Sequence, residues 1–423
     1  MRRIYTFFLY LLMPFILLRL VWKGRRHPAY RKRIAERFSI GARLPKSVDI
    51  WVHAVSLGEV VAATPLIEGL LAAKHRVLVT TMTPSGLQQV QAKFGTRVEN
   101  QYLPYDLPWC LRRFFRRLNA RVGVIMETEL WPNLIHNAKL AGLQLALVNA
   151  RLSDNAFHHY QKTGTLFKPV LSQFTLIGAQ SELDAQRYLA LGAPQQIVRV
   201  LGNMKFDMIH PGSMLDRFSS FKVSWGKHRP VFIAASTHDD EENQLLNRLI
   251  QLKMAIPGIL LLIAPRRPER FQAVYELSQR HAFKTALRSR PESITPNVDV
   301  VVLDCIGELL GFFQLSDYAF VGGSLVPIGG HNVLEPIAMG IPVFCGPFMQ
   351  NSKTICTDLQ KAQAIQWTKN VDELIRILIN MHQNPVQRTQ QVANATAVLK
   401  ANQGTVVEYL REIEGLDSRL KNQ

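Results

Sequence analysis

Hydrophobic and polar positions along the chain predict repeated strand–helix units. From Asp49 onward, short runs rich in β-branched residues predict buried parallel strands, and the stretches between them, such as Val60–Ala73 and Trp131–Ala141, have the apolar spacing of helices. The strands expected in the first half are Asp49–Ala54, Arg76–Thr81, Val122–Met126, Leu143–Asn149, Leu176–Ala179 and Ile197–Leu201. Those expected in the second half are Val231–Ala235, Ile259–Ala264, Val298–Leu303, Tyr318–Val321 and Val343–Cys345. This alternation predicts two parallel-sheet α/β domains with a ligand cleft outside the carboxyl ends of the strands.

A break in the strand–helix rhythm gives the domain boundaries. A segment with Pro211-Gly212 and mixed polar residues interrupts the pattern, and we interpret residues 211–229 as a linker. The N-terminal domain is then expected at 47–210 and the C-terminal domain at 230–423. The C-terminal tail predicts two helices parted at Asn384-Pro385, which can pack back across the domains.

The first 30 residues differ from the rest of the chain. Ile4 to Trp22 form a largely apolar run, interrupted by Arg19, that is long enough to cross a hydrocarbon core of ~30 Å. Lys23-Gly-Arg-Arg-His27 stands where a signal peptide would have its small-residue cleavage site, so we expect residues 1–30 to be a retained membrane anchor with a basic flank. That flank predicts cytoplasmic domains by the positive-inside rule. The length does not decide whether the anchor spans the bilayer or lies in one leaflet.

Charge is concentrated at the N-terminus. Residues 1–46 contain twelve Lys or Arg and one Glu, and so contribute +11 of the formal +18, which leaves +7 on the rest of the chain. Because the rest has no RNA- or DNA-binding motif, we expect no nucleic-acid partner, and a membrane surface with anionic lipid fits the basic segment better. A hydrophobic content of 47% excludes a largely disordered chain. The four cysteines form no C-x-x-C pair, which is typical of reduced thiols in a reducing compartment.

The most informative segment is Val321–Pro336, with the sequence VGGSLVPIGGHNVLEP. It follows an expected strand, and its end overlaps an expected helix, Asn332–Gly340, that closes on a C-cap glycine. Two glycine pairs, the second ending at Gly330, allow the backbone to approach a ligand closely, and a helix N-terminus attracts phosphate. Glu335 can accept hydrogen bonds from ribose hydroxyls. The alternative is a tight strand-to-helix turn without a ligand.

Carboxylates stand at the ends of two expected strands in the first half. Gly58-Glu59 lies in a strand-to-helix turn, where the helix dipole favours an ionised Glu59 that can act as general base, although capping of the helix is an equally open interpretation. Glu127 and Glu129 follow the strand Val122–Met126. Acidic side chains at a buried strand end are costly unless they are paired or functional, so these two are either catalytic or held in a salt bridge.

Polar residues of the second half suit an anionic ligand. Ser236 and Thr237 follow a strand and can either bind phosphate or cap the next helix. The segment Ala264–Arg270 follows the next strand with three arginines, of which Arg266 comes first, and guanidinium groups match phosphate geometry. Ordinary surface charge is the alternative for one or two of them. Lys205 closes the last strand of the first half and can reach the cleft.

Several kinds of chemistry can be set aside because their motifs are missing from the sequence. The chain has no D-x-D triplet, which usually holds a divalent ion for a nucleotide-sugar diphosphate, and no H-E-x-x-H, G-x-S-x-G, Walker A or G-x-G-x-x-G motif. We therefore expect no metal and no cofactor.

Together these segments resemble the 3-deoxy-D-manno-octulosonic acid (Kdo) transferases of lipopolysaccharide assembly. The segments that carry the resemblance come in the family's order and cover nearly the whole chain: His53–Glu59, Glu127–Asn133, Gly202–Asp207, Ala264–Arg266, Gly322–Ser324 and Gly329–Asn332. The resemblance implies a GT-B fold and a metal-free, inverting transfer of Kdo from CMP-Kdo to the lipid A precursor, lipid IVA, at the cytoplasmic face of the inner membrane.

The resemblance also implies roles for individual residues. Glu59 would be the catalytic base, and Glu129 or Glu127 a second essential carboxylate. The residues that would hold the CMP are Arg266, Gly323, Ser324, Asn332 and Glu335.

Two other functions stay open. A GT-B enzyme that uses a UDP-sugar would share the Gly-rich loop and the cleft but would lack the block Glu127–Pro132. A non-catalytic, basic membrane-binding protein would explain the anchor and the charge, but not the carboxylates at strand ends.

Leu111–Leu118 interleaves four arginines with Phe114 and Phe115, which is typical of a membrane-interface patch or of a solvated helix face over a buried Phe pair.

Overall fold

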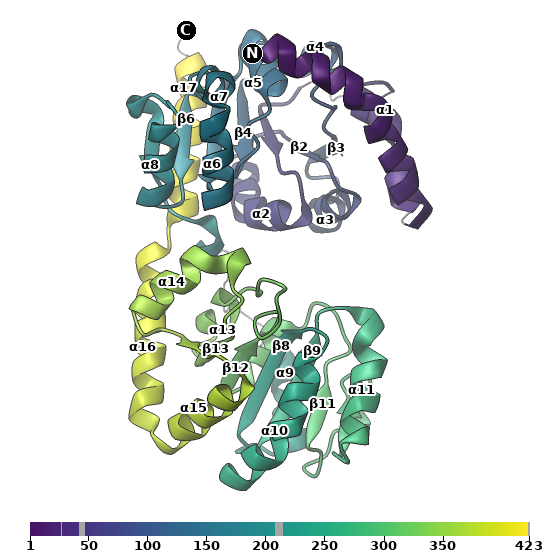
Figure 1. Cartoon of the computed structure of the whole chain (residues 1–423), viewed down its shortest axis with the longest axis vertical. Coiled ribbons are helices and arrows are strands. Elements are labelled where there is room, and N and C mark those ends of the chain that lie inside the picture. The colour runs from purple at the N-terminus through teal and green to yellow at the C-terminus, as the bar shows by residue number, and fades with distance from the viewer. Residues whose placement is uncertain (27, 42–46, 208–214, 422–423) are drawn as a thin grey trace. The chain divides into compact units, whose positions relative to one another are not determined.

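The computed structural model describes residues 1–26, 28–41, 47–207 and 215–421 (Figure 1). The chain divides into two compact units, one formed by Met1–Met208 with Asn402–Gln423 and the other by Ile209–Ala401. The expected boundary at 210/211 and the first residues of the linker lie outside the described residues. The remainder of the expected linker includes helix α9, Leu215–Trp225, which belongs to the second unit.

The first unit is built on a parallel sheet in the order β3-β2-β1-β4-β5-β6-β7. Its strands are β1 Ile50–His53, β2 Val77–Thr81, β3 Glu99–Tyr102, β4 Val122–Met126, β5 Gln144–Ala150, β6 Leu176–Ala179 and β7 Val198–Val200. The order reverses at the pair β1/β4, because the chain first builds outward on one side of β1 and then on the other. The carboxyl ends of β1 and β4 therefore form the topological switch point, where ligands of such sheets bind.

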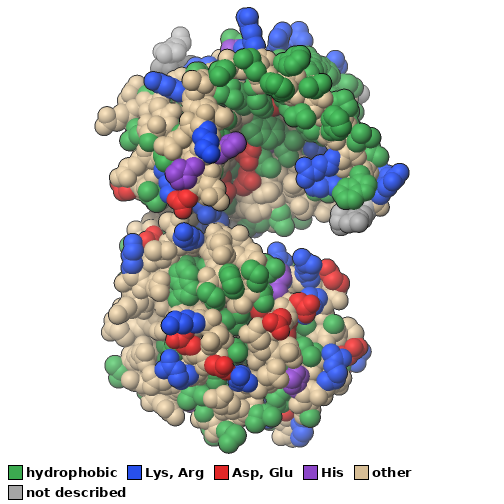
Figure 2. Space-filling model, viewed as in Figure 1, with side chains coloured by type: hydrophobic (Ala, Val, Ile, Leu, Met, Phe, Trp, Pro, Cys, Tyr) green, Lys and Arg blue, Asp and Glu red, His purple; other side chains and the backbone are tan. Residues whose placement is uncertain are grey.

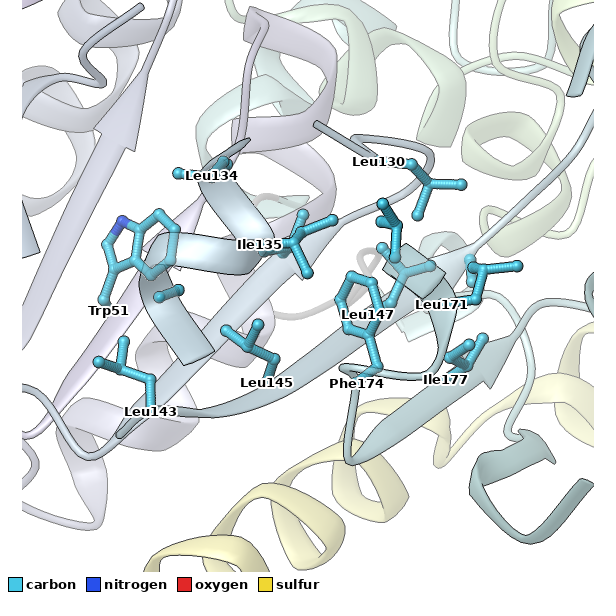
Figure 3. Packing of buried hydrophobic residues seen from close by; sticks show 14 of the residues in the cluster. Trp51, Leu130, Leu134, Ile135, Leu143, Leu145, Leu147, Leu171, Phe174 and Ile177 are labelled. Atoms are coloured by element: carbon cyan, nitrogen blue, oxygen red, sulfur yellow. The ribbon is translucent and has the colours of Figure 1, made fainter. Parts of the chain in front are cut away.

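Helices cover both faces of this sheet. They are α1 Arg2–Arg26, α2 Leu57–Ala72, α3 Pro84–Phe94, α4 Pro108–Phe115, α5 Pro132–Leu140, α6 Asp154–Lys162, α7 Gly164–Leu171, α8 Glu182–Ala190 and α17 Thr405–Lys421. The period of two in a strand divides the core. Leu145 and Leu147 of β5 pack with Ile135 of α5 on one face (Figure 3), whereas Ala146 and Val148 join the cluster that includes α2 and α17 on the other.

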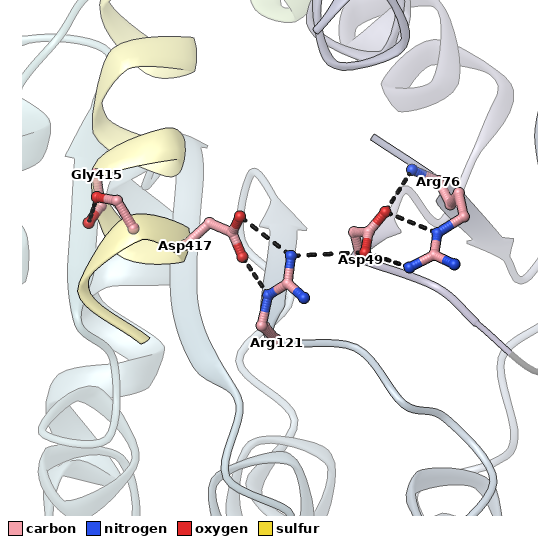
Figure 4. A network of polar contacts seen from close by, with 6 residues as sticks. Asp49, Arg76, Arg121, Gly415 and Asp417 are labelled. Atoms are coloured by element: carbon pink, nitrogen blue, oxygen red, sulfur yellow. Dashed lines mark hydrogen bonds and ion pairs between the residues drawn. The ribbon is translucent and has the colours of Figure 1, made fainter. Parts of the chain in front are cut away.

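The C-terminal helix α17 returns to the first unit. Tyr409 is fully buried, donates a hydrogen bond to Gly178 O at 2.7 Å and occupies the space that a Cβ on Gly178 would need. Asp417 accepts a bond from Arg121 Nη2 at 3.2 Å, and Arg121 also contacts Asp49 at 3.5 Å (Figure 4). The sequence assigned residues 402–423 to the C-terminal domain, and the structure instead places them with the first unit.

The second unit repeats the architecture with a parallel sheet in the order β10-β11-β9-β8-β12-β13-β14. Its strands are β8 Val231–Thr237, β9 Leu260–Pro265, β10 Thr285–Leu287, β11 Val300–Val302, β12 Tyr318–Val321, β13 Val343–Cys345 and β14 Gln366–Trp367. Its helices are α9, α10 Glu241–Ala255, α11 Phe271–Arg280, α12 Leu309–Gln314, α13 Leu334–Ala338, α14 Lys353–Lys361, α15 Val371–Gln383 and α16 Pro385–Asn402. Its switch point is the pair β8/β12, from which the Gly-rich segment departs.

The two α/β domains with parallel sheets are confirmed, and every strand expected from hydrophobic runs is present. Three short strands were not expected: Glu99–Tyr102, which is polar, Thr285–Leu287, and Gln366–Trp367, which has only two residues. In α4, Phe114 and Phe115 are buried while the four arginines around them are exposed, which agrees with a solvated helix face over a buried Phe pair.

Helix α1 is the one helix among the described residues that is long and apolar enough to cross a membrane, by length and composition.

Candidate active site

Glu59 lies at the start of α2, directly after β1, and forms a reciprocal cap with Ser56. Ser56 Oγ accepts a hydrogen bond from Glu59 N–H, and donates one to Glu59 Oε1 at 2.9 Å. Glu59 Oε2 accepts a bond from Val55 N–H at 2.8 Å. This is a variant of the capping box, in which the Glu59 carboxylate accepts from Val55 N–H instead of Ser56 N–H, and it fixes the position of the carboxylate.

The environment of Glu59 changes its acidity. The pKa of Glu59 is raised to about 7, chiefly by burial and in smaller part by the nearby carboxylates of Glu129 and Glu127, against the hydrogen bonds from Val55 and Ser56 that lower it. A carboxylate with a pKa near neutrality can take a proton from a hydroxyl and still be ionised in part of the population. Capping and general-base chemistry are therefore compatible in Glu59.

Glu127 and Glu129 follow β4, at the other side of the same switch point. Glu127 has a positive φ of 55°, and a turn closed by Leu130 N–H to Thr128 O at 2.8 Å carries the chain to α5. Burial raises the pKa of Glu129, and a hydrogen bond from Trp131 lowers it in part. Among the described residues no salt bridge includes Glu59, Glu127 or Glu129. The three carboxylates thus form one acidic cluster without an arginine partner.

His53 is the last residue of β1. It was assigned no role of its own from the sequence, only a place in the segment His53–Glu59. Its Nδ1 contacts Thr80 Oγ1 at 2.9 Å, its ring meets Trp131 edge-on at 5.8 Å, and its Nε2 is buried without a hydrogen-bond partner. Burial lowers the pKa of His53 to about 4, so the imidazole is neutral. His53 supports the indole that contacts Glu129.

Lys205 lies on the 3-10 turn Met204–Asp207 and is half-exposed. Asp207, at the end of the same 3-10 turn, has a structural role, since it accepts hydrogen bonds from the N–H groups of Gly404 and Val406 at the start of α17. Lys205 thus belongs to the first unit, as do the three carboxylates. The other predicted site residues belong to the second unit.

Arg266 follows β9 in the second unit and lines a cavity of about 180 Å³ at the carboxyl ends of β8, β9 and β11. Ser236, with a positive φ of 56°, lines the same cavity, together with Phe271, Ile306 and Glu308. Arg266 is exposed at this site. Thr237 is fully buried instead, and donates a hydrogen bond to Glu242 Oε1 at 2.9 Å. The structure therefore gives Thr237 a partner in the core and leaves Ser236 and Arg266 at the cavity.

The Gly-rich turn after β12 is organised by Glu241, a residue that the sequence did not single out. Glu241 is fully buried and accepts hydrogen bonds from the N–H groups of Gly323 at 2.7 Å, Ser324 at 3.0 Å and Leu325 at 2.9 Å. Ser324 Oγ accepts a bond from Gly346 N–H at 2.8 Å. Because the N–H groups of Gly323 and Ser324 already donate to Glu241, the predicted contacts of these two residues with CMP would have to use other atoms.

The second glycine pair and the short helix after it place His331, Asn332 and Glu335. Helix α13 begins only at Leu334, because Asn332 Oδ1 accepts a bond from Leu334 N–H at 3.1 Å, so it is shorter than the expected Asn332–Gly340. Asn332 Nδ2 donates to Glu335 Oε1 at 3.1 Å. Burial raises the pKa of Glu335, and Arg266 lowers it, which shows that the two charges are near each other. Gly330 has a φ of 73°, and a Cβ there would collide with Met349 Sδ.

Two histidines flank this turn. His238 Nε2 and His331 Nε2 are 2.8 Å apart with the rings stacked at 4°, so the pair shares one proton. Burial and Arg266 lower the pKa of His331 to about 4. No group of three or more His, Cys, Asp or Glu suited to a metal ion occurs in the part of the chain that the structure describes.

Comparison with known proteins identifies relatives along the whole chain. A family model described as 3-deoxy-D-manno-octulosonic-acid transferase (kdotransferase) matches residues 32–208. A 3-deoxy-D-manno-octulosonic acid transferase from Haemophilus influenzae is 36% identical over 97% of this chain and 97% of its own length, and one from Bordetella pertussis is 32% identical over 98% and 99%. The crystal structure of a glycosyltransferase from Rickettsia africae shares the fold, with a TM-score of 0.59 and 12% identity over 89% of this chain and 100% of that one.

Proposed function

The chain belongs to the 3-deoxy-D-manno-octulosonic acid (Kdo) transferase family, and on this premise we propose that it moves Kdo from CMP-Kdo to a lipid A precursor, lipid IVA. It is a GT-B glycosyltransferase that transfers Kdo in lipopolysaccharide biosynthesis. The proposal adds the acceptor, the roles of the site residues, the independence from metal and cofactor, and the location at the cytoplasmic face of the inner membrane.

The observation that carries the mechanism is the position of Glu59 at the switch point of the first sheet, with a pKa of about 7. Glu59 removes the proton of an acceptor hydroxyl as the oxygen forms its bond to the anomeric carbon of Kdo. The bond between that carbon and the phosphate oxygen of CMP breaks, and its electron pair leaves with CMP. Attack from the side opposite to the leaving group inverts the anomeric centre. Burial, with a smaller contribution from Glu129 and Glu127, keeps the pKa of Glu59 high enough for it to accept the proton.

The donor side of the reaction uses positive charge from the protein. CMP carries a single phosphate, and Arg266 at the cavity of the second unit is placed to bind it and to stabilise the charge that develops as it leaves. Asn332 and Glu335, which contact each other beside Arg266, are proposed to bind the ribose hydroxyls. No divalent ion is needed in this scheme, because a guanidinium can balance one phosphate.

The acceptor side is proposed to be a membrane lipid. Lipid IVA is a bisphosphorylated glycolipid, and the first unit combines an exposed apolar helix, α1, with the exposed arginines of α4. A basic and apolar surface matches an anionic lipid in a bilayer.

A donor-exchange assay tests the function. The purified full chain is incubated with lipid IVA in detergent and with CMP-Kdo, UDP-glucose or UDP-N-acetylglucosamine, and release of the free nucleotide is measured with and without acceptor. Acceptor-dependent release of CMP, with no release of UDP, is the expected result.

The two alternatives give different results in the same assay. Acceptor-dependent release of UDP would identify a GT-B enzyme that uses a UDP-sugar. Binding of lipid vesicles without release of any nucleotide would identify a non-catalytic membrane-binding protein, and either result would overturn the proposal.

A further inference from the structure

Helix α1 is docked on the first unit along its entire length. Side chains that recur every three or four residues define one face of the helix, and this face is buried or half-buried. We call it the docked face, and its members are Tyr5, Thr6, Leu9, Met13, Ile16, Leu17, Leu20 and Gly24. The docking therefore extends from the first turn of the helix to its last.

The first turn is held by polar contacts at the start of α5. Asn133 is fully buried, and its Oδ1 accepts bonds from Arg2 Nη1 and Thr6 Oγ1, each at 3.1 Å. Tyr5 is hydrogen-bonded to Asp106, and Asp106 accepts bonds from the N–H groups of Asn133 at 3.2 Å and Leu134 at 2.6 Å. Asp106 thus caps α5, and Asp106 and Asn133 together hold the beginning of α1.

The middle and the end of α1 contact the same unit. Met13 is only 8% exposed, in a cluster with Leu107 and Cys110 of the α4 region. At the end, Gly24 lies against Arg31, whose Cγ is 2.5 Å from the place of a Cβ on Gly24. The segment that follows α1 is itself fixed to the sheet edge, since Glu36 accepts a bond from Tyr102 N–H at 3.1 Å.

The opposite face of α1 is exposed and apolar. Its exposed side chains, which we call the exposed face, are Ile4, Phe7, Phe8, Leu11, Leu12, Phe15, Leu18 and Val21. Figure 2 shows this hydrophobic surface over α1, with Lys and Arg side chains at its borders. Arg3, Arg19 and Arg25 are exposed on the helix itself. Contiguous apolar surface of this extent marks an interaction site.

We propose that α1 is a monotopic helix that lies along the membrane interface, with its exposed face in one leaflet of an anionic bilayer and both ends on the side of the enzyme. A helix of 25 residues is ~37 Å long and would span a hydrocarbon core only if its two ends lay on opposite sides. Here the first turn and the middle of the helix contact one folded unit, and the last turn contacts Arg31 in the following segment, which is itself bonded to that unit through Glu36. A spanning arrangement would separate Arg2 and Thr6 from Asn133 and strip the docked face from the domain.

The arrangement has a consequence for the site of the proposed function, on which this step rests. Asn133 comes two residues after Trp131, the residue that contacts Glu129. The contact between Asn133 and the first turn of α1 therefore ties the carboxylate segment to the membrane-lying helix. The depth of α1 in the bilayer would therefore set the depth of the segment that carries Glu129.

Sidedness of the helix ends is the first test. Full-length Arg3→Cys and Arg25→Cys proteins, in a Cys305→Ser background because the other three cysteines are buried, carry an NBD label and are bound to preformed vesicles of phosphatidylethanolamine with phosphatidylglycerol. External dithionite should bleach both labels at similar rates. Bleaching at position 25 with protection at position 3 would establish a spanning helix and overturn the inference. Absence of vesicle binding would overturn both this inference and the proposed membrane association, whereas donor release in detergent would remain unaffected.

Depth along the helix is the second test. Spin labels at Ile4, Leu11 and Leu18, all on the exposed face, should report the same depth of ~5–10 Å by their accessibility to oxygen and to a water-soluble nickel complex. A maximum of depth at Leu11, with shallow values at the other two, would contradict an in-plane helix.

A matched pair of variants tests the contact between Asn133 and the first turn of α1. Asn133→Ala should increase the mobility of the label at Ile4, whereas Asn137→Ala should not, because the Asn137 side chain is buried on the same helix and donates to Asn133 O, with no described contact to α1. Equal mobility in the two variants would show that Asn133 does not hold α1.

Discussion

Glu59 combines a structural and a chemical role in one side chain. Its capping box with Ser56 stabilises α2 and at the same time aims the carboxylate at the switch point of the sheet. The neighbouring carboxylates and the burial supply the shift in pKa that a base requires. Neither role needs a movement of the backbone.

Replacement of the base is the first prediction. Glu59→Gln keeps the shape and the hydrogen bond to Val55 but cannot accept a proton, so kcat should fall by ~10²–10⁴. The matched control is Glu68→Gln on the same helix, where an exposed pair with Arg97 contributes little to stability. CMP release and the thermal midpoint are measured for both. A Glu59→Gln enzyme with normal turnover would move the role of base to Glu127 or Glu129.

The acidity of Glu59 gives a second prediction, on pH. The rate should rise as the pH increases through about 7, because Glu59 must lose its proton to act. Stability should change in the opposite direction. The folded pKa of Glu59 lies above its ordinary value of 4.5, so its contribution to stability is fully present below 4.5 and is lost as the pH rises through about 7. Urea unfolding at pH 5 and pH 7.5 should therefore show a smaller loss in Glu59→Gln than in the parent. An equal loss in both would contradict a raised pKa.

Individual residues differ in how far the sequence could place them. Capping of α2 by Glu59 was one of two interpretations that the sequence left open, and the structure confirms that Glu59 takes part in the cap. Glu241 could not be found in this way, because its partners Gly323 and Ser324 come 82 and 83 residues later and meet it only through the pairing of β8 with β12. His331 likewise meets His238 from another part of the chain.

At the scale of elements, the Gly-rich turn depends on both steric fit and buried charge. A Cβ on Gly322 would lie 2.6 Å from Ser236 O, so the turn can pass the end of β8 only with glycine. Glu241 then fixes the turn through three backbone N–H groups. The shape of the proposed donor site thus depends on how β8, α10 and the turn after β12 fit together.

The third prediction tests this element. Glu241→Ala leaves three N–H groups of the turn without their acceptor, at ~1–3 kcal/mol for each that stays buried and unpaired. The thermal midpoint should fall and KM for CMP-Kdo should rise. Asp240→Asn is the control, since it changes the exposed charge next to Glu241 in the chain and asparagine tolerates the positive φ of 75°. A Glu241→Ala protein with the parent's KM and midpoint would show that the turn is held in another way.

Elements were predictable where burial is uniform. Strands such as Val122–Met126 are apolar at every position because helices cover both faces, and such runs stand out in a sequence. Strand β3 has the sequence ENQY and is exposed in part. Its conformation is therefore decided by its pairing with β2, and not by its composition. The start of α13 at Leu334 depends on the hydrogen bond that the Asn332 side chain accepts from Leu334 N–H. The spacing of apolar residues does not predict such a bond.

At the scale of the whole molecule, the return of α17 could not be read from the sequence. Its apolar positions fit a helix on either unit. The choice is made by Tyr409, which fills the space over Gly178, and by Asp207, which caps the helix. The N-terminal helix was predicted as an anchor, but its docked face was not, because an almost uniformly apolar helix does not reveal which side meets protein.

Removal of the helix is the fourth prediction. Deletion of residues 1–26 uncovers Leu107 and Cys110, which pack with Met13, so the truncated protein should fold with a lower thermal midpoint. It should transfer Kdo in detergent, and should be slower than the full chain on lipid IVA in anionic bilayers. Equal rates on bilayers at every salt concentration would show that α1 does not deliver the enzyme to its acceptor.

Metal dependence is the fifth prediction. Because the proposed donor site uses Arg266 to balance a single phosphate, transfer should continue in excess EDTA. Arg266→Lys keeps the charge but loses the two-pronged geometry and should raise KM for CMP-Kdo, with Arg267→Lys as the neighbouring control. Inhibition by EDTA that magnesium reverses would contradict the scheme.

The most direct measurement of the central claim is the mass of the glycolipid product formed by the full chain from CMP-Kdo and lipid IVA, with the Glu59→Gln protein in parallel. The account predicts a product that carries at least one added Kdo, formed together with CMP, and almost none of it with Glu59→Gln. Unchanged lipid IVA with the parent chain, or equal product with both proteins, would contradict the account.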